Sequence, residues 1–197
     1  GRSAGIEFMA QKTAGKTTGW LSYTLSKSDR KFTKGGINNG EWFPYKYDRR
    51  HSINLTINHK FSDRIDIGAS WVFYTGGTST IPEEKTTVIR PHNGANNGFL
   101  WYGTYDNTNS SPTIGDVSYI EHRNNFRLPA SHRLNLGVNF NKKTKHGMRT
   151  WNISLYNAYN AMNPAWVYRG HNKQGLSVIK KYTLLPLIPS FTYTYKF

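Results

Sequence analysis

The sequence has no cysteine among its 197 residues. Disulfide bonds, thiolate metal ligands and cysteine nucleophiles are therefore excluded within this chain. No uninterrupted apolar run approaches the roughly 20 residues that a membrane-spanning helix needs, so these residues form no helical span.

The motifs of the common enzyme classes are missing as well. The sequence holds no Gly-x-Ser-x-Gly elbow, no phosphate-binding Walker loop and no His-Glu-x-x-His metal motif. We therefore expect a protein that is not an enzyme, with no catalytic residue, no metal site and no cofactor.

Acidic residues are scarce, with 11 Asp and Glu against 26 Lys and Arg and a formal net charge of +15. Such a balance often indicates nucleic-acid binding. Here the cations are scattered without a stripe or a nucleic-acid motif, and the densest group is Lys142, Lys143 and Lys145. Lipid phosphates are the simpler partner, and we predict no nucleic acid.

What the sequence does contain is alternation of apolar and polar residues with period two, which is the pattern of β-strands. Ile53, Leu55 and Ile57, for example, alternate with Ser, Thr and Asn. We predict seven strands, an all-β chain, from the stretches that alternate in this way: 6–11, 21–26, 52–58, 65–73, 133–140, 150–155 and 191–197.

A soluble antiparallel sandwich also alternates, but two features favour a transmembrane sheet. The polar positions are mostly Ser, Thr, Asn and Gly rather than Lys and Glu, as suits a wet interior. Aromatic residues also gather at strand ends, as in the girdles at membrane interfaces; these are Trp20, Tyr74, Trp151, Tyr156, Tyr159 and Phe197.

The connections between the predicted strands alternate in length. Those over 13–18, 61–64 and 141–147 are short, whereas those over 28–49, 75–130 and 160–187 are long. Short periplasmic turns and long extracellular loops are typical of outer-membrane β-barrels. We therefore predict a segment of an antiparallel transmembrane β-barrel in a bacterial outer membrane, with the C-terminus in the periplasm.

Seven strands do not complete such a barrel, since bacterial single-chain barrels have an even number of at least eight. An open sheet edge cannot face lipid, because its unpaired backbone groups would each cost several kcal/mol. We expect the missing strands to come from a preceding region of the protein or from a partner.

Three stretches carry a resemblance to a known family: INNGEWFPYKYDRRHSINL (37–55), WNISLYNAYNAMNPAWVY (151–168) and LLPLIPSFTYTYKF (184–197). Together they resemble the C-terminal part of TonB-dependent outer-membrane receptors of the Bacteroidetes kind. The resemblance implies a 22-stranded barrel with an N-terminal plug, which imports a scarce nutrient with energy passed on by TonB.

On this resemblance, residues 1–197 are the last seven strands, and the plug and the TonB-binding box belong to a region that is not in this chain. The implied partners are outer-membrane lipid and lipopolysaccharide, the N-terminal barrel and plug, TonB through that region, the barrel assembly machinery and a surface lipoprotein. The closing pattern of outward aromatics matches the family's assembly signal, carried here by Phe191, Tyr193, Tyr195 and Phe197.

Two of the long loops, 28–51 and 75–130, hold the candidate ligand-binding residues, and we expect 75–130 to set selectivity, because long loops on a rigid scaffold commonly carry recognition. Aromatic and cationic side chains could grip an anionic or aromatic ligand. The candidates are Trp42, Tyr45, Arg90, His92, Trp101, Tyr102 and Arg123. For residues 28–51 a structural role competes, in which Asp48 pairs with Arg50 within the barrel wall.

The last long connection is predicted to contain a hairpin, with arms over 165–169 and 176–182 around the turn 171–175. Its cations Arg169, Lys180 and Lys181 could face lipopolysaccharide or be plain surface charge.

Two rival functions stay open: a partner or client within an outer-membrane assembly complex, and a small barrel enzyme. The substrate of a receptor also stays open among ferric siderophore, haem, cobalamin, peptide and glycan.

Overall fold

A computed structural model describes residues 1–34, 36–90 and 113–197. The chain divides into one unit over Gly1–Ile81 and His122–Phe197 and a second over Pro82–Glu121. No helix among the described residues is long and apolar enough to cross a membrane.

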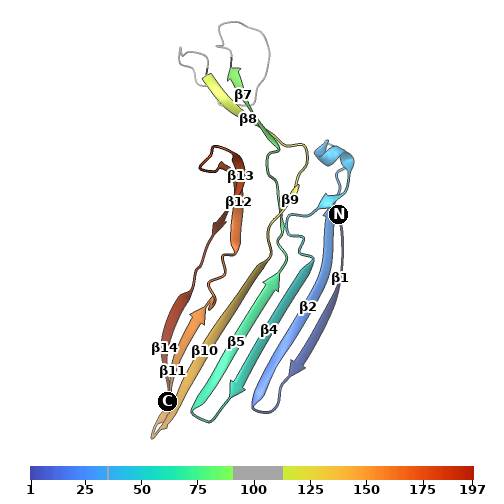
Figure 1. The fold of residues 1–197 in the computed structure, drawn as a ribbon. Helices are drawn as coiled ribbons and strands as arrows, with labels where there is room; N and C mark the ends of the chain where they lie inside the picture. The colour runs from blue at the N-terminus through green and yellow to red at the C-terminus, as the bar shows by residue number, and fades with distance from the viewer. Residues whose placement is uncertain (35, 91–112) are drawn as a thin grey trace. The chain divides into compact units, whose positions relative to one another are not determined.

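The first unit is built around one antiparallel sheet (Figure 1). Its strands follow in the order β1, β2, β4, β5, β10, β11, β14. Their bounds are Arg2–Lys12, Thr17–Arg30, His51–Lys60, Ile65–Tyr74, Ser131–Thr144, Gly147–Tyr156 and Ile188–Lys196. Each of the seven predicted strands is therefore confirmed as a strand, and the all-β antiparallel class with them. Neighbours in the sheet are also neighbours along the chain once the loop elements are set aside.

The sheet is open rather than closed. Within the described residues, β1 and β14 each pair with one neighbour, while the short β3 (Phe43–Pro44) adds to β2. A closed barrel is therefore not what these residues form by themselves, and the transmembrane barrel remains a prediction.

The register brings apolar residues together on one face, here called the apolar face. Cross-strand partners share a face, and one row runs from Ile57 through Ala69 and Leu136 to Leu155. The next row runs through Ile67, Val138, Ile153 and Phe191. A slip by one residue would break every such row, because it would turn a strand's apolar side chains to the other face.

The opposite or polar face carries a network of side-chain hydrogen bonds across β5, β10 and β11. The Asp66 carboxylate accepts from Asn139 Nδ2 at 2.7 Å and from Asn141 Nδ2 at 2.6 Å. Asn139 Oδ1 accepts from Asn152 Nδ2 at 2.7 Å, and Asn141 Oδ1 accepts from Thr150 Oγ1 at 2.8 Å. The predicted small polar residues thus satisfy one another on this face.

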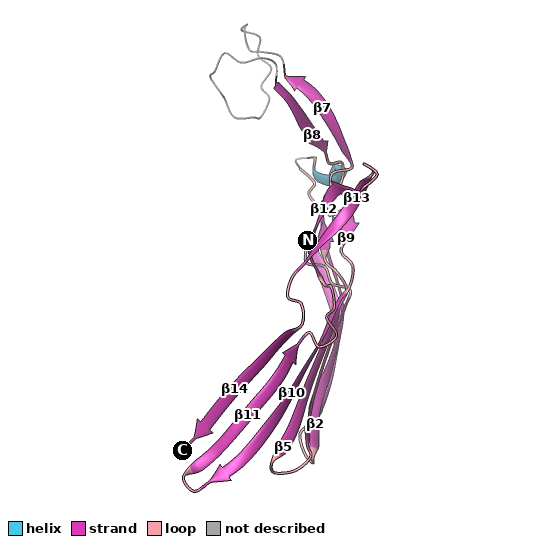
Figure 2. Cartoon of the chain, turned by 60° about the vertical axis from the view of Figure 1, so that its left-hand side comes forward, coloured by secondary structure: helices cyan, strands magenta, loops and turns pink. Residues whose placement is uncertain are grey.

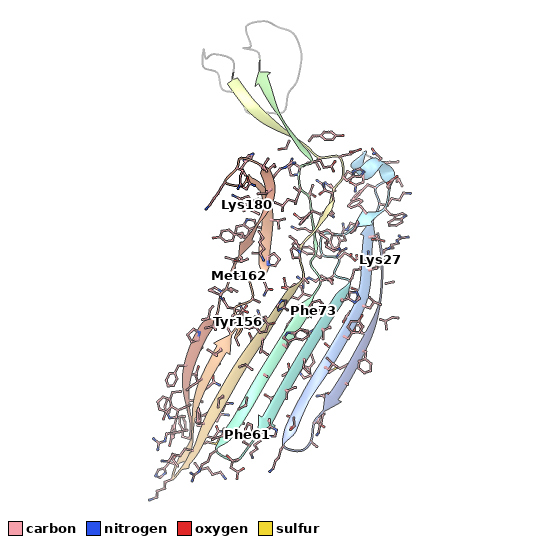
Figure 3. The ribbon with its side chains drawn as sticks, viewed as in Figure 1. Lys27, Phe61, Phe73, Tyr156, Met162 and Lys180 are labelled. Atoms are coloured by element: carbon pink, nitrogen blue, oxygen red, sulfur yellow. The ribbon has the colours of Figure 1, made fainter. Side chains whose placement is uncertain are left out.

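No second layer covers either face of this sheet in the described part of the chain (Figure 2). Only Phe43 and Ile81 are buried among the described apolar residues, and both lie in loops or short strands outside the seven-stranded row. Figure 3 shows the side chains standing free along the strands. The sheet has no hydrophobic core of its own.

The connections differ at the two ends of the strands. Short turns over 13–16, 61–64 and 145–146 join β1 to β2, β4 to β5 and β10 to β11. The long connections hold the remaining elements: a 3-10 turn η1 (Ile37–Gly40), β6 (Thr78–Ser79) paired with β9 (Phe126–Arg127), and the hairpin of β12 (Pro164–His171) and β13 (Ser177–Thr183). The predicted hairpin in the last connection is confirmed.

The second unit contains another antiparallel pair, β7 (Glu84–Arg90) and β8 (Thr113–Tyr119). Its register runs from Glu84 opposite Tyr119 to Arg90 opposite Thr113. Both strands lie within the long connection predicted over 75–130.

Three asparagines spaced three residues apart, within 157–163, hold the last long connection against the sheet. The Asn157 side chain is buried and bonds Ala161 N, Ala161 O and Leu185 O, at 2.8 to 3.1 Å. Asn160 Oδ1 accepts from Leu187 N at 3.1 Å, and Asn163 bonds both backbone groups of His132. Asn157 also adopts the left-handed conformation, with φ 53°, which Asn tolerates better than most residues.

We predict that Asn157→Ala lowers the unfolding free energy of the native protein by about 3 kcal/mol, because three backbone groups lose the buried side chain that bonds them. Urea unfolding followed by intrinsic fluorescence measures the change. Asn58→Ala is the matched control, since Asn58 is an exposed strand residue, and it should shift the unfolding free energy by less than about 0.5 kcal/mol. Equal effects of the two variants would contradict the bracing role of Asn157.

Candidate functional site

The loops above β2, β4 and β5 are organised around Asp48. Its side chain is fully buried and forms ion pairs with Arg50 Nε at 2.9 Å and with an Arg127 guanidinium nitrogen at 2.6 Å. Its other carboxylate oxygen accepts from the backbone N–H of Ser28 at 2.7 Å. The predicted pair of Asp48 with Arg50 is thus present, and it is one part of a larger centre.

Arg127 is the part that sequence reasoning missed. It lies 79 residues after Asp48, and besides the ion pair it donates to Asp48 O at 2.8 Å and to Gly76 O at 2.9 Å. One guanidinium therefore joins the loop before β4, the segment after β5 and the segment before β10. Arg127 follows Phe126 in β9, but nothing in its local sequence sets it apart from the other loop cations.

The pKa of Asp48 reflects two opposing effects. Burial alone would raise it, but the hydrogen bonds from Arg127, the Ser28 N–H and Arg50 outweigh burial and hold the pKa below its ordinary value. Asp48 is therefore charged at neutral pH, as the two guanidinium groups around it require.

Asparagine side chains clamp the same loops together. Asn38 bonds both backbone groups of Arg123, at 2.8 and 3.2 Å. Asn124 Nδ2 donates to Pro44 O at 2.7 Å, and the Asn125 side chain bonds Ile81 N and O at 2.9 Å. We call residues 37–48, 76–81 and 122–127 the loop platform.

Aromatic residues of the loop platform are stacked with cations of the chain itself. The Arg2 guanidinium lies 4.3 Å from the centre of the Trp42 ring, and that of Arg30 lies 3.9 Å from the Tyr45 ring. Tyr45 also meets the exposed Tyr47 edge to face at 5.4 Å. The stacking expected between these rings and a ligand is thus partly taken up by arginines of the chain.

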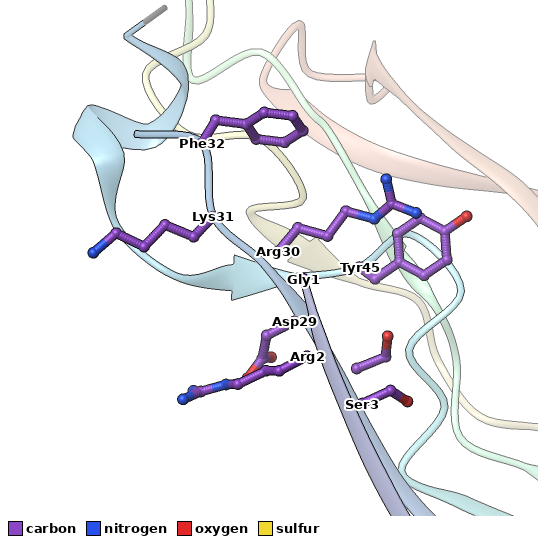
Figure 4. Close-up of a pocket in the computed structure, with 9 residues that line it drawn as sticks. Gly1, Arg2, Ser3, Asp29, Arg30, Lys31, Phe32 and Tyr45 are labelled. Atoms are coloured by element: carbon purple, nitrogen blue, oxygen red, sulfur yellow. The ribbon is translucent and has the colours of Figure 1, made fainter. Parts of the chain in front are cut away.

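A shallow depression of about 470 Å³ lies next to these rings (Figure 4). Arg2, Arg30 and Lys31 bring positive charge to it, and Asp29 is the one acidic residue among those that line it. Arg2 and Lys27 lie 3.0 and 3.3 Å from the Asp29 carboxylate and neutralise it. The depression therefore suits an anionic group better than a cation.

The predicted ligand-binding residues have different outcomes. Trp42 and Tyr45 belong to one neighbourhood, since Arg2 both lines the depression and covers Trp42, while Tyr45 lines it directly. Arg123 is held there through its backbone. Arg90 ends β7, and His92, Trp101 and Tyr102 lie outside the described residues. Whether these residues bind a ligand stays a prediction.

Comparison with family models, with curated proteins and with solved structures finds no match to this chain.

We predict that the loop platform loses stability in acid because Asp48 becomes protonated. A lowered pKa means that the contribution of Asp48 is fully present above about pH 4 and is lost as the pH falls through the folded pKa. At pH 7, Asp48→Asn should cost about 2 kcal/mol, since it leaves two guanidinium groups without their anion. In this variant the urea midpoint should also fall less between pH 7 and pH 3 than it does in the unchanged protein. The urea midpoint of the native protein between pH 3 and pH 7 measures both effects.

Asp63→Asn is the control, because Asp63 is exposed in the turn 61–64 and pairs only with Lys60 among the described residues. It should leave the midpoint at pH 7 and its pH dependence close to those of the unchanged protein. If Asp48→Asn behaved like Asp63→Asn, Asp48 would not hold the loops.

Proposed function

We propose that this chain forms part of the barrel wall and outer loops of a TonB-dependent outer-membrane receptor, which imports a scarce nutrient. The motifs in 37–55, 151–168 and 184–197 support the family, and the architecture of the sheet supports a membrane setting. On this proposal the apolar face meets lipid and the polar face meets the lumen and the plug.

One observation carries the membrane setting: on several strands the apolar side chains are more exposed than their polar neighbours. Leu136, Phe140 and Ile153 are exposed by 37, 42 and 50%. Asn135 and Asn139, on the opposite face of the same strand β10, are half-buried and less exposed than Leu136 and Phe140. A sheet in water would be expected to hide the first group and show the second.

The height of the apolar face fits a bilayer. On β5 the apolar residues from Ile65 to Phe73 span about 27 Å along the strand, on the order of the 25 Å apolar band of outer-membrane barrels. Basic residues lie next to the apolar rows at the turn end of the strands, such as Lys12 on β1 and Lys142 on β10.

The polar face fits a protein-filled lumen. Its hydrogen-bonded chain of Asp66, Asn139 and Asn152 satisfies its own polar groups and leaves small residues such as Gly68 and Gly137 opposite each other. Such a face can lie against water or against another polar surface, as the plug of a receptor would supply.

The loop platform is suited to binding a ligand at the surface. Long loops that Asp48 and the asparagine clamps hold in place can present Trp42, Tyr45 and the basic depression to a ligand at little further cost in entropy. The net positive charge of the chain favours anionic forms of the nutrient.

Nitroxide labels on the two faces of β10 test the membrane setting. We expect a label at Leu136→Cys in the native protein to be accessible to oxygen and shielded from a polar nickel complex. Asn135→Cys is the matched control one residue away, and its label should show the reverse. The chain has no cysteine to interfere. A label at Leu136→Cys that neither reagent reaches would indicate a packed soluble core and overturn the proposal.

Capture by TonB tests the receptor role. The native protein should be retained by the immobilised periplasmic domain of TonB, and its denatured mass should be several times the 22.6 kDa of this chain. A native protein of 22.6 kDa that TonB does not retain would instead indicate a small barrel enzyme or a component of an assembly complex.

A further inference from the structure

A cationic row crosses the apolar face where β10, β11 and β14 reach the short turns. Lys142 lies opposite Arg149, and Arg149 lies opposite Tyr195, so all three residues share the apolar face. In Figure 1 this is the end of the sheet where the C-terminus lies beside the β10–β11 turn. Two cations thus lie side by side on the same face as the apolar rows, where an anion at that level would neutralise them.

The surface is hollowed at the same place. A depression of about 400 Å³ is lined by Thr144, Lys145, His146, Arg149, Tyr193 and Tyr195. Thr144 Oγ1 lies 3.5 Å from the Tyr195 hydroxyl. Cationic groups, a histidine and three hydroxyl groups thus converge on one small concavity, and all can donate hydrogen bonds to phosphate oxygens.

Aromatic residues border the concavity on the side of the apolar rows. The Trp151 ring lies 4.5 Å from that of Tyr193 and 5.1 Å from that of Phe191, and Phe140 is opposite Trp151 in the register. Tryptophan and tyrosine favour the boundary between headgroups and acyl chains. The cations therefore follow the aromatic rings in the order that a phospholipid presents its parts.

Leaving histidine aside, all the charged side chains of the segment that holds this concavity are basic. Residues 122–197 contain 12 Lys and Arg and no Asp or Glu. None of the ion pairs shown by the described residues uses Lys142, Lys145 or Arg149. Lys143 differs, since it belongs to the polar face and its charge acts on Asp63.

We propose that Lys142, Lys145, His146 and Arg149, with Tyr193 and Tyr195, form a binding site for the phosphate headgroup of an anionic phospholipid in the leaflet beside the short turns. The acyl chains lie along Trp151 and Phe191. This inference rests on the membrane setting proposed above and adds a defined lipid site to it. A free phosphate ion shares the headgroup chemistry but makes no use of the aromatic border.

Native mass spectrometry of the whole protein tests the site. The protein is titrated with phosphatidylglycerol and with phosphatidylcholine of the same acyl chains. We expect one phosphatidylglycerol to bind at least tenfold more tightly than phosphatidylcholine. Lys142→Ala combined with Arg149→Ala should weaken this binding about 25-fold, or about fivefold for each cation removed near the membrane surface.

The control combines Lys60→Ala with Lys143→Ala, which removes two positive charges at the same end of the sheet but from the polar face. It should change the affinity for phosphatidylglycerol less than twofold. Equal binding of the two lipids, or equal losses in the two double variants, would overturn the proposal. Displacement of phosphatidylglycerol by an equal concentration of inorganic phosphate would overturn it too, in favour of a free-ion site.

This result is distinguishable from failure of the membrane setting. If the labels on β10 place Leu136 in lipid while the two lipids bind equally, only the lipid site is wrong. If the labels place Leu136 in a packed core, the proposed function fails and the lipid site with it.

Discussion

The in-register pairing of apolar side chains across seven strands is the constraint on which this structure depends. The backbone ladder satisfies the N–H and C=O groups of the inner strands, but it buries almost no side chain, and no second layer supplies a core. Rows such as Ile57, Ala69, Leu136 and Leu155 therefore gain their stability from each other and from whatever covers the face. In the membrane setting proposed above, lipid would supply this covering.

The long connections solve a second problem, which is to hold extended loops in place without a hydrophobic core. They do so with polar side chains that bond the backbone of distant segments. Asp48 with Arg127, Asn38 with Arg123 and Asn157 with Leu185 join residues separated by 79, 85 and 28 positions. Removing one of these polar side chains would leave its partner unsatisfied, and that costs more free energy than the hydrogen bond itself contributes. The same arrangement leaves aromatic and cationic groups exposed on the loop platform.

The two ends of the apolar face differ in charge. At the loop end, Asp29 lies between Arg2 and Lys27, so the cations there are partly neutralised within the chain. At the turn end, the segment 122–197, which contains Lys142 and Arg149, has no acidic residue that could neutralise them. In the proposed membrane setting, this asymmetry favours an anionic lipid at the turn end of the sheet.

The sequence by itself determined the seven strands, their two faces and the alternation of short and long connections, because period-two patterning is local and each strand carries it independently. It also indicated Asp48 with Arg50, which are two residues apart. Only the tertiary structure decided that Arg127 completes that centre, that the three asparagines of 157–163 bond three separate segments, and that Lys142, Arg149 and Tyr195 form one row. Those partners are set by strand register and loop closure over tens of residues, and no local pattern encodes which distant side chain arrives.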